Sequence, residues 1–332
     1  MHIKIIMSAL ALAATALPVH GETRWTSDRP DGHAPMGVMA DHAHSAGEWM
    51  LAYQFTRMQM SRLRDGSERI STAEALDDFN AAPTDMDMDM HMLMLMYAPT
   101  DRLTLMVMGH YMDNTMDMAM SGGMTGTMET SGIGDTFVGG IYKMIDADRQ
   151  QVLLNFGVSL PTGSTDEDVD MMGGMRAGYP MQLGSGTLDL RPGLTWLGQS
   201  DQWSWGAQTM ATVRTGENSE DYTLGDELML TAWGARRVNE WLSLSLRVEQ
   251  HQFSNVDGAD PEMNPAASPV TAPGNQGGER TSLGLGANVH LQGDALAGHR
   301  VGMEFLRPVR ERLDGPQMAG NYIFTLAWEY AF

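Results

Sequence analysis

The chain of 332 residues contains no cysteine, which excludes disulfide bonds and thiolate metal ligands. Basic residues are also scarce: 21 lysines and arginines face 42 aspartates and glutamates, giving a formal net charge of −21. Such acidity argues against a nucleic-acid partner, because contacts with phosphate backbones need a basic surface. After residue 21 the sequence also lacks any apolar run approaching the ~20 residues of a transmembrane helix.

Residues 1–21 have the parts of a secretory signal. The basic start MHIK precedes the apolar run IIMSALALAATAL, and Val19 and Gly21 place small residues at the −3 and −1 positions of a cleavage site. We therefore expect residues 1–21 to be a signal peptide that exports the chain and is cleaved after Gly21.

Residues 48–332 contain many strand-like segments of about ten residues with alternating polarity. Trp49, Leu51, Tyr53 and Phe55 form one such apolar row, and similar rows occur at 152–160, 242–249, 283–290 and 322–332. Strands of this length, apolar on one face and small or polar on the other, are typical of transmembrane barrels, whereas soluble sandwiches use shorter strands. The sequence predicts an all-β fold: a transmembrane, antiparallel, up-and-down β-barrel of about twelve strands.

The predicted connections alternate between short turns and long polar loops. This pattern is typical of periplasmic turns and extracellular loops, and it places both termini on the periplasmic side. We expect turns near 98–102, 145–150, 198–202, 236–240 and 292–298, and loops near 63–84, 113–131, 163–185, 215–222, 252–279 and 307–320.

The ending LAWEYAF closes on the aromatic residue Phe332, preceded by Tyr330 and Trp328. It resembles the C-terminal signal by which outer-membrane barrels are recognised for assembly. We expect the chain to lie in the outer membrane of a Gram-negative bacterium, with the barrel-assembly machinery, outer-membrane lipid and lipopolysaccharide as partners.

The segment 22–47 is rich in Gly, Pro, His and Asp, and we predict that it is irregular and able to occupy the barrel lumen. Imidazole and thioether groups gather in it and suit soft or borderline metals such as copper. Its candidate ligands are His33, Met36, Met39, His42 and His44. A polar segment that only fills the pore is the competing interpretation, and no zinc motif is present.

Methionine occupies every second position from Met86 to Met96 and recurs at Met106, Met108 and Met112. Because side chains alternate across a strand, the sulfurs of each strand lie on one face of a hairpin. Thioethers facing a lumen would be ligands for Cu(I), whereas methionine is otherwise a flexible hydrophobe that fills irregular space. The candidate metal ligands of this hairpin are Met88, Met90, Met92, Met94, Met106, Met108, His110 and Met112.

The turn near Ala98–Asp101 decides which way these methionines face. An odd number of loop residues pairs the methionine row with Met106, Met108, His110 and Met112; an even number pairs it with Leu103, Leu105 and Val107, since a one-residue slip exchanges the faces of a strand. We favour the first register, with the sulfurs in the lumen and Asp87 and Asp89 at the outer rim.

If the apolar faces meet lipid, charged residues of both signs line the interior and either surround a conduit or neutralise one another in a filled barrel. The candidate lumen residues are Asp189, Arg191, Arg214, Arg247, Glu249, His290, Arg300 and Glu304. No catalytic constellation is present, so we expect the chain not to be an enzyme.

Acidic loops occur at 165–170, 217–221 and 257–262. Carboxylates are ligands for Ca²⁺, and Asp257–Glu262 is a candidate calcium site, although a full EF-hand pattern is absent. A solvated loop bridged to lipopolysaccharide by divalent ions is the favoured interpretation.

The sequence resembles the Gram-negative outer-membrane transporter family of the phenol-degradation (MetA-pathway) type, and its methionine-rich, copper-associated members in particular. The resemblance rests on HAPMGVMADHAHSAGEWMLAYQF, MDMHMLMLMYAPTDRLTLM, SGIGDTFVGGIYK, LNFGVSLPTGS, YPMQLGSGTLDLRPGLTWLGQSDQWSWGAQ, DGADPEMNP and LDGPQ. It implies a barrel with an export or uptake role.

Three functions are consistent with these observations. The leading hypothesis is a passive conduit or binding protein for a small solute, with copper ions favoured by the Met and His clustering. A FadL-like or porin-like barrel for small hydrophobic or aromatic compounds is the second, and a non-conducting structural or surface-interaction barrel is the third.

Overall fold

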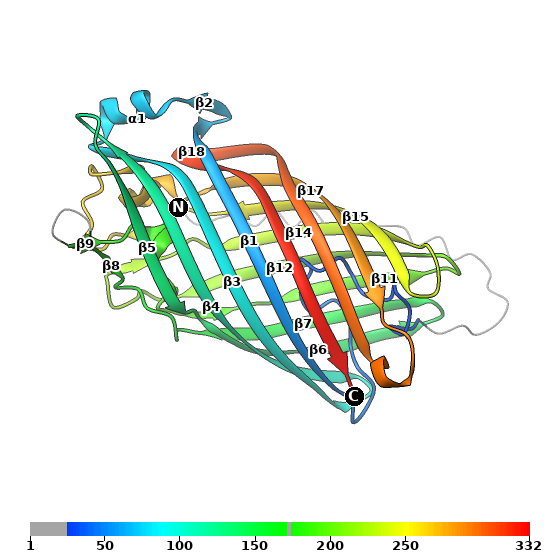
Figure 1. The fold of residues 1–332 in the computed structure, drawn as a ribbon. Coiled ribbons are helices and arrows are strands. Elements are labelled where there is room, and N and C mark those ends of the chain that lie inside the picture. Colours follow the sequence, from blue (N-terminus) through cyan, green and yellow to red (C-terminus); the bar gives the residue numbers. More distant parts are fainter. Residues whose placement is uncertain (1–24, 171–173) are drawn as a thin grey trace.

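The computed structural model describes residues 25–170 and 174–332; the predicted signal peptide lies outside them. The described chain forms a closed antiparallel β-barrel in which neighbouring strands are mostly neighbours in sequence (Figure 1). Pairing of β12 with β14 and of β1 with β18 completes the ring. Its strands are β1 (Trp49–Gly66), β3 (Ala81–Thr100), β4 (Leu103–Met120), β5 (Thr125–Ile133), β6 (Thr136–Ala147), β7 (Gln150–Leu160), β10 (Leu188–Leu190), β11 (Gly193–Gln199), β12 (Trp203–Thr215), β14 (Glu227–Arg237), β15 (Leu242–Phe253), β17 (Gly278–His290) and β18 (His299–Ala331).

Strand β18 crosses the wall twice. Residues 300–313 pair with β17 and residues 313–331 pair with β1, and Gly315, at φ 75°, lies at the bend between the two halves. The rings of Phe305 and Tyr322 stack across these halves at 5.3 Å. Strands β5 and β6 both pair with β4, one after the other along it, so together they form one interrupted crossing. Strands β10 and β11 both pair with β7 and with β12 and form another interrupted crossing. Counted this way, the wall has about twelve crossings, as the alternating connections predict.

The two faces of the wall differ in polarity. Outward-facing leucines are strongly exposed, including Leu93 at 60% and Leu285 at 64%. Inward-facing positions carry small and polar side chains that are almost completely buried, such as Asn155, Thr195 and Ser282. An apolar exterior around a polar interior is the arrangement of a barrel whose wall contacts lipid, so the predicted fold class is confirmed.

Connections at one end are short, and those at the other end carry most of the remaining elements. The long connections contain β2 (Glu68–Ile70) and α1 (Thr72–Asp78), β8 (Asp168–Val169), β9 (Met175–Arg176) and η1 (Tyr179–Met181), β13 (Tyr222–Thr223), and β16 (Asp257–Gly258), η2 (Pro269–Thr271) and η3 (Pro273–Asn275); η4 (Asp294–Leu296) lies on a connection at the short-turn end. Among the described residues, no helix is long and apolar enough to cross a membrane.

Two predicted loops are wrong. Residues 113–131 continue β4 and β5 as a tight hairpin, and residues 307–320 belong to the two halves of β18. Both segments lie beyond the lipid-facing band, where the outer face of a strand is polar: Thr127 Oγ1, for example, donates to Asp117 at 2.6 Å. In the sequence, a strand with a polar outer face looks like a polar loop, although its backbone still pairs with the neighbouring strand.

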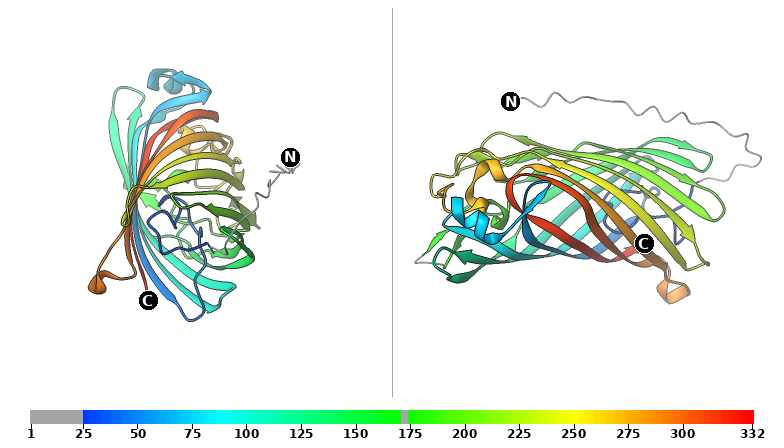
Figure 2. Two further views of the ribbon diagram at one scale, coloured as in Figure 1. Left: turned by 90° about the vertical axis from the view of Figure 1, so that its right-hand side faces the viewer. Right: turned by 90° about the horizontal axis from the view of Figure 1, so that it is seen from above.

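The segment 25–47 has no regular secondary structure and lies inside the barrel near its short-turn end (Figure 2). Interior side chains hold its backbone. Arg300 donates to the carbonyl oxygens of Ser27, Arg29 and Pro30 at 2.8–3.1 Å, and Asn288, Asn155 and Gln208 donate to those of Ala34, Ala40 and Met39. We call residues 25–47 the plug segment.

We expect Arg300→Ala to loosen the plug segment. The substitution removes three hydrogen bonds to carbonyl groups, one buried and two partly buried, and hydrogen bonds from charged groups contribute roughly 1.5–3 kcal/mol each. Proteinase K should then cut within residues 25–47 while the barrel stays intact, as read by mass spectrometry. Arg102→Ala, at the exposed turn between β3 and β4, is the matched control, and equal protection in both variants would contradict the anchoring role of Arg300.

Candidate functional site

The β3–β4 hairpin has the register in which methionine faces methionine. Met96 pairs with Met106, Met94 with Met108, and Met90 with Met112, after an irregularity between Tyr97 and Thr100. Met96 and Met106 are 1% and 4% exposed, whereas Leu95 and Leu105 on the other face are 37% and 44% exposed. The prediction that the sulfurs face the interior is therefore confirmed. Asp89 lies on the outer face, where it pairs with Arg57 of β1.

We call the inward-facing methionines of β3 and β4 the methionine ladder. Strand β1 extends this ladder on the other side of β3. Every inward-facing methionine of β3, from Met86 to Met96, has at least one Met or His directly beside it on β1 or β4. The rows, read from the long-loop end to the short-turn end across β1, β3 and β4, are Met60–Met86–Met116, Met58–Met88–Asn114, Thr56–Met90–Met112, Gln54–Met92–His110, Ala52–Met94–Met108 and Met50–Met96–Met106. Met116 also pairs with Met128 of β5.

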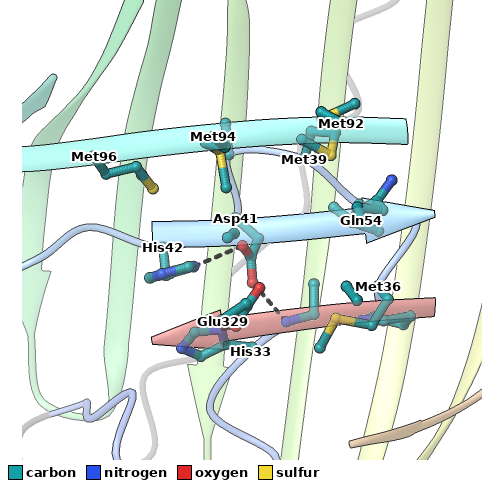
Figure 3. Close-up of a pocket in the computed structure, with 16 residues that line it drawn as sticks. His33, Met36, Met39, Asp41, His42, Gln54, Met92, Met94, Met96 and Glu329 are labelled. Carbon is teal, nitrogen blue, oxygen red and sulfur yellow. Dashed lines mark hydrogen bonds and ion pairs between the residues drawn. The ribbon is translucent and has the colours of Figure 1, made fainter. Parts of the chain in front are cut away.

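The plug segment meets this ladder at one cavity of about 30 Å³ (Figure 3). The plug contributes two histidines, two methionines and a carboxylate, while β3 contributes three methionines and β18 a second carboxylate. The polar and sulfur-bearing side chains of this Met/His pocket are His33, Met36, Met39, Asp41, His42, Gln54, Met92, Met94, Met96 and Glu329.

The imidazoles and carboxylates of the pocket are in mutual contact. Nitrogen and oxygen atoms of His33, Asp41 and His42 lie within 4.8 Å of one another, and all three residues are buried. The Nδ1 atom of His42 is 2.7 Å from Oδ1 of Asp41, and Nδ1 of His33 is 2.9 Å from Oε2 of Glu329. Asp41 also accepts a hydrogen bond from the Ala34 N–H at 2.6 Å, which fixes the carboxylate in place.

The two histidines have different proton affinities. Burial, reinforced by the charge of Arg300, lowers the pKa of His33 well below its usual value and so favours the neutral imidazole. Burial opposes protonation of His42 as well, but the adjacent Asp41 carboxylate outweighs it and raises the pKa of His42. Nε2 of His42 has no hydrogen-bond partner among the described residues. The pocket thus offers imidazole nitrogens and thioether sulfurs beside negative charge.

The structure brings together only part of the predicted ligand set. His33, Met36, Met39, His42, Met92 and Met94 line the pocket, and the ring of His44 lies 4.9 Å from that of His42. Met88, Met90, Met106, Met108 and Met112 belong to the ladder outside the pocket, and the ring of His110 packs against Gly134. Sequence reasoning missed Asp41 and Glu329, although Glu329 faces inward by simple alternation with Trp328 and Tyr330.

Six of the eight predicted lumen residues pair with one another or with the plug. Arg247 contacts Glu304 at 3.0 Å and Glu249 at 3.3 Å, and Arg214 pairs with Asp189. Arg300 holds the plug and lies 3.8 Å from Glu329. Arg191 lies over the ring of Phe137, and His290 is half-buried. In this conformation the charges neutralise one another across a filled interior.

The acidic loops converge on Arg176, which is 8% exposed. Its guanidinium lies 3.0–3.5 Å from carboxylates of Asp168, Glu220, Asp260 and Glu262, and these residues join three of the long connections. A cation of the protein therefore occupies the centre of this cluster. The calcium site at Asp257–Glu262 stays a prediction.

A closed antiparallel wall with an apolar outer face and a polar interior defines the chain as a β-barrel of the outer-membrane type. Residues 97–303, more than half of the sequence, match the family described as "Putative MetA-pathway of phenol degradation", and the chain belongs to this family. A comparison with curated proteins gives no match.

Two solved structures illustrate the similarity in fold. An outer membrane channel from Pseudomonas putida F1 is 15% identical, with a TM-score of 0.60 over 89% of this chain and 99% of the other. The transport unit of the autotransporter AIDA-I from Escherichia coli is 9% identical, with a TM-score of 0.52 over 89% and 93%.

We expect Arg247→Met to destabilise the barrel by about 3–5 kcal/mol, because it leaves the carboxylate of Glu304 buried without its partner. In Arg247→Met/Glu304→Gln, the neutral side chain can still accept the hydrogen bond from the Gly37 N–H, so much of the loss should be recovered. Urea unfolding in detergent, followed by tryptophan fluorescence, measures both effects. Arg236→Met, at an exposed position, is the control; a loss no larger than that of the control would refute the coupling.

Proposed function

We propose that this barrel is an outer-membrane conduit or binding protein whose cargo is a soft metal ion, Cu(I). The observation that carries the proposal is the meeting of the plug with the methionine ladder in one cavity lined by His33, His42, Met92 and Met94. Two parts of the sequence that are rich in soft ligands and separated in the chain are thereby brought side by side.

The chemistry of the pocket favours a soft cation. Thioether sulfurs select Cu(I), and imidazole binds copper in either oxidation state. Asp41 and Glu329 supply negative charge that offsets the cost of holding a cation in a buried site. The lowered pKa of His33 favours its neutral form, which offers a nitrogen lone pair without first losing a proton.

The size of the cavity also favours an ion. Its volume of about 30 Å³ suits a bare ion or a water molecule. Cavities that accept benzene are about 150 Å³, so an aromatic ring would need the plug to move.

The methionine ladder offers an ion a path along the inner face of the barrel wall. Successive rows are two residues apart along a strand, which corresponds to about 6.6 Å, and every row offers at least two Met or His ligands. Thioethers bind individually weakly, so an ion can pass from row to row without being trapped. The row Met60–Met86–Met116–Met128 would be the end of this route at the long-loop side, and the Met/His pocket its end at the short-turn side.

The proposed setting is the outer membrane of a Gram-negative bacterium, reached after removal of residues 1–21, with the long connections outside the cell. Outer-membrane lipid, lipopolysaccharide and the barrel-assembly machinery are the proposed partners. The C-terminal residue Phe332 exchanges two backbone hydrogen bonds with Trp49 at the seam between last and first strands, which supports a role of the C-terminus in closure.

Uptake of a small hydrophobic or aromatic solute is the second candidate. It is favoured by the description of the family, which refers to phenol degradation, and by the ability of methionine to form an adaptable apolar lining. On this view the plug moves aside and the ladder contacts the solute directly.

The two candidates differ in a titration of the purified full-length barrel carrying ¹³C-methyl methionine. We expect micromolar Ag(I), a stable probe for Cu(I), to shift the methyl signals of Met92, Met94 and Met96 because their sulfurs line the pocket. His33→Ala/His42→Ala should weaken this binding at least tenfold. His91→Gln, which removes an exposed imidazole on the outer face of β3, should leave it unchanged.

Unchanged signals at micromolar Ag(I) would contradict the soft-ion function. Shifts of the same signals with phenol, but not with Ag(I), would favour the second candidate. Signals that shift with neither phenol nor Ag(I) would favour a non-conducting barrel.

A further inference from the structure

A separate hollow of about 290 Å³ lies at the other end of the wall from the pocket, between β1, β2 and the two halves of β18. Arginine dominates its lining. The five arginines are Arg62, Arg64, Arg69, Arg307 and Arg310. We call this feature the arginine hollow.

The charge of the hollow is opposite to that of the chain as a whole. About a quarter of the 21 lysines and arginines gather here in a protein of net charge −21. The one carboxylate of the lining, Glu311, is already held by Arg280 at 2.8 Å, by Arg64 at 3.5 Å and by the Gly320 N–H at 3.0 Å. Within the described residues, Arg62, Arg69 and Arg307 form no ion pair. The arginine hollow therefore has unused positive charge and donors.

The backbone is shaped to direct one of these arginines outward. The pairing of β1 with β18 is irregular between Ser61 and Leu63, and Arg62 between them has φ 64°, a strained value for a residue with a side chain. Bulges of this kind redirect a side chain, and such strain is concentrated at ligand-binding sites. Leu63, the next residue, is 2% exposed, so the bulge separates an outward arginine from an inward leucine.

The arginine hollow lies at the edge of the lipid-facing band that is nearer the long connections. Arg307 is paired with Leu283, and the next outward pair toward the short-turn end is Phe305 with Leu285; Leu283, Leu285 and Phe305 are 54%, 64% and 44% exposed. Phe305 and Tyr322, which stack on each other, are themselves part of the lining. A ligand here would contact guanidinium groups and, next to them toward the short-turn end, apolar and aromatic side chains.

We propose that the arginine hollow binds the phosphate groups of a phosphorylated lipid headgroup in the outer leaflet. Guanidinium groups bind phosphate oxygens through paired hydrogen bonds, and several of them at a membrane interface recognise anionic headgroups. The acyl chains of the lipid lie along the exposed band that Leu283, Leu285 and Phe305 form. This site is independent of the soft-ion pocket and of its cargo.

The test uses the full-length barrel in detergent and native mass spectrometry with three probes: diphosphorylated lipid A, fully dephosphorylated lipid A and inorganic phosphate. We expect the diphosphorylated lipid to bind at least tenfold more tightly than the dephosphorylated lipid. Arg62→Gln/Arg307→Gln/Arg310→Gln should remove that preference. The exposed positions of all three make a folding defect unexpected, and heat-modifiable migration on gels checks it.

The matched control is Arg102→Gln/Arg236→Gln, which removes exposed arginines at the short-turn end and should keep the full preference. An unchanged preference in the triple variant would overturn the assignment of the site. Inorganic phosphate binding as tightly as the diphosphorylated lipid would overturn the assignment to a lipid. The triple variant with lysine in place of glutamine should retain part of the preference, since the charge remains and the paired hydrogen bonds are lost.

Discussion

The register of the β3–β4 hairpin is the constraint on which the interior of this barrel depends. Because strand side chains alternate with a period of two, the irregularity between Tyr97 and Thr100 determines the face of every methionine that follows. In the observed register, Met86 to Met96 face inward beside methionines of β1 and β4, and leucines face lipid. A slip of one residue would put the sulfurs in the membrane and the leucines against the plug.

The plug segment completes this arrangement. Its backbone carbonyls are held by Arg300, Asn288, Asn155 and Gln208, which are inward-facing residues of different strands. Those contacts place His33 and His42 opposite the sulfurs of β3, with Asp41 and Glu329 beside them. The buried ion pair of Arg247 with Glu304 lies beside the plug, because Glu304 also accepts a hydrogen bond from the Gly37 N–H.

Much of the fold could be predicted from sequence, because a lipid-facing strand must alternate and the exposed rows from Trp49 to Phe55 and from Leu283 to Val289 do so. The sequence favoured inward-facing sulfurs, but that choice depends on the parity of one turn, and the structure supplies the parity. Sequence reasoning failed at residues 113–131 and 307–320, where strands extend beyond lipid and their outer faces become polar. The pocket itself could not be predicted as a unit. It depends on how an irregular segment lies against β3 and β18, and no periodic pattern encodes the meeting of His33 with Glu329.

The central claim is that the plug and the ladder together bind a soft ion. Anomalous diffraction from crystals of the full chain soaked in Ag(I) or grown with Cu(I) tests it most directly, because the signal locates the ion without reference to any assumed ligand. The account predicts a peak in the Met/His pocket, within bonding distance of an imidazole nitrogen of His33 or His42 and of a sulfur of Met92 or Met94. Peaks confined to the outer surface, with none in this cavity, would contradict it.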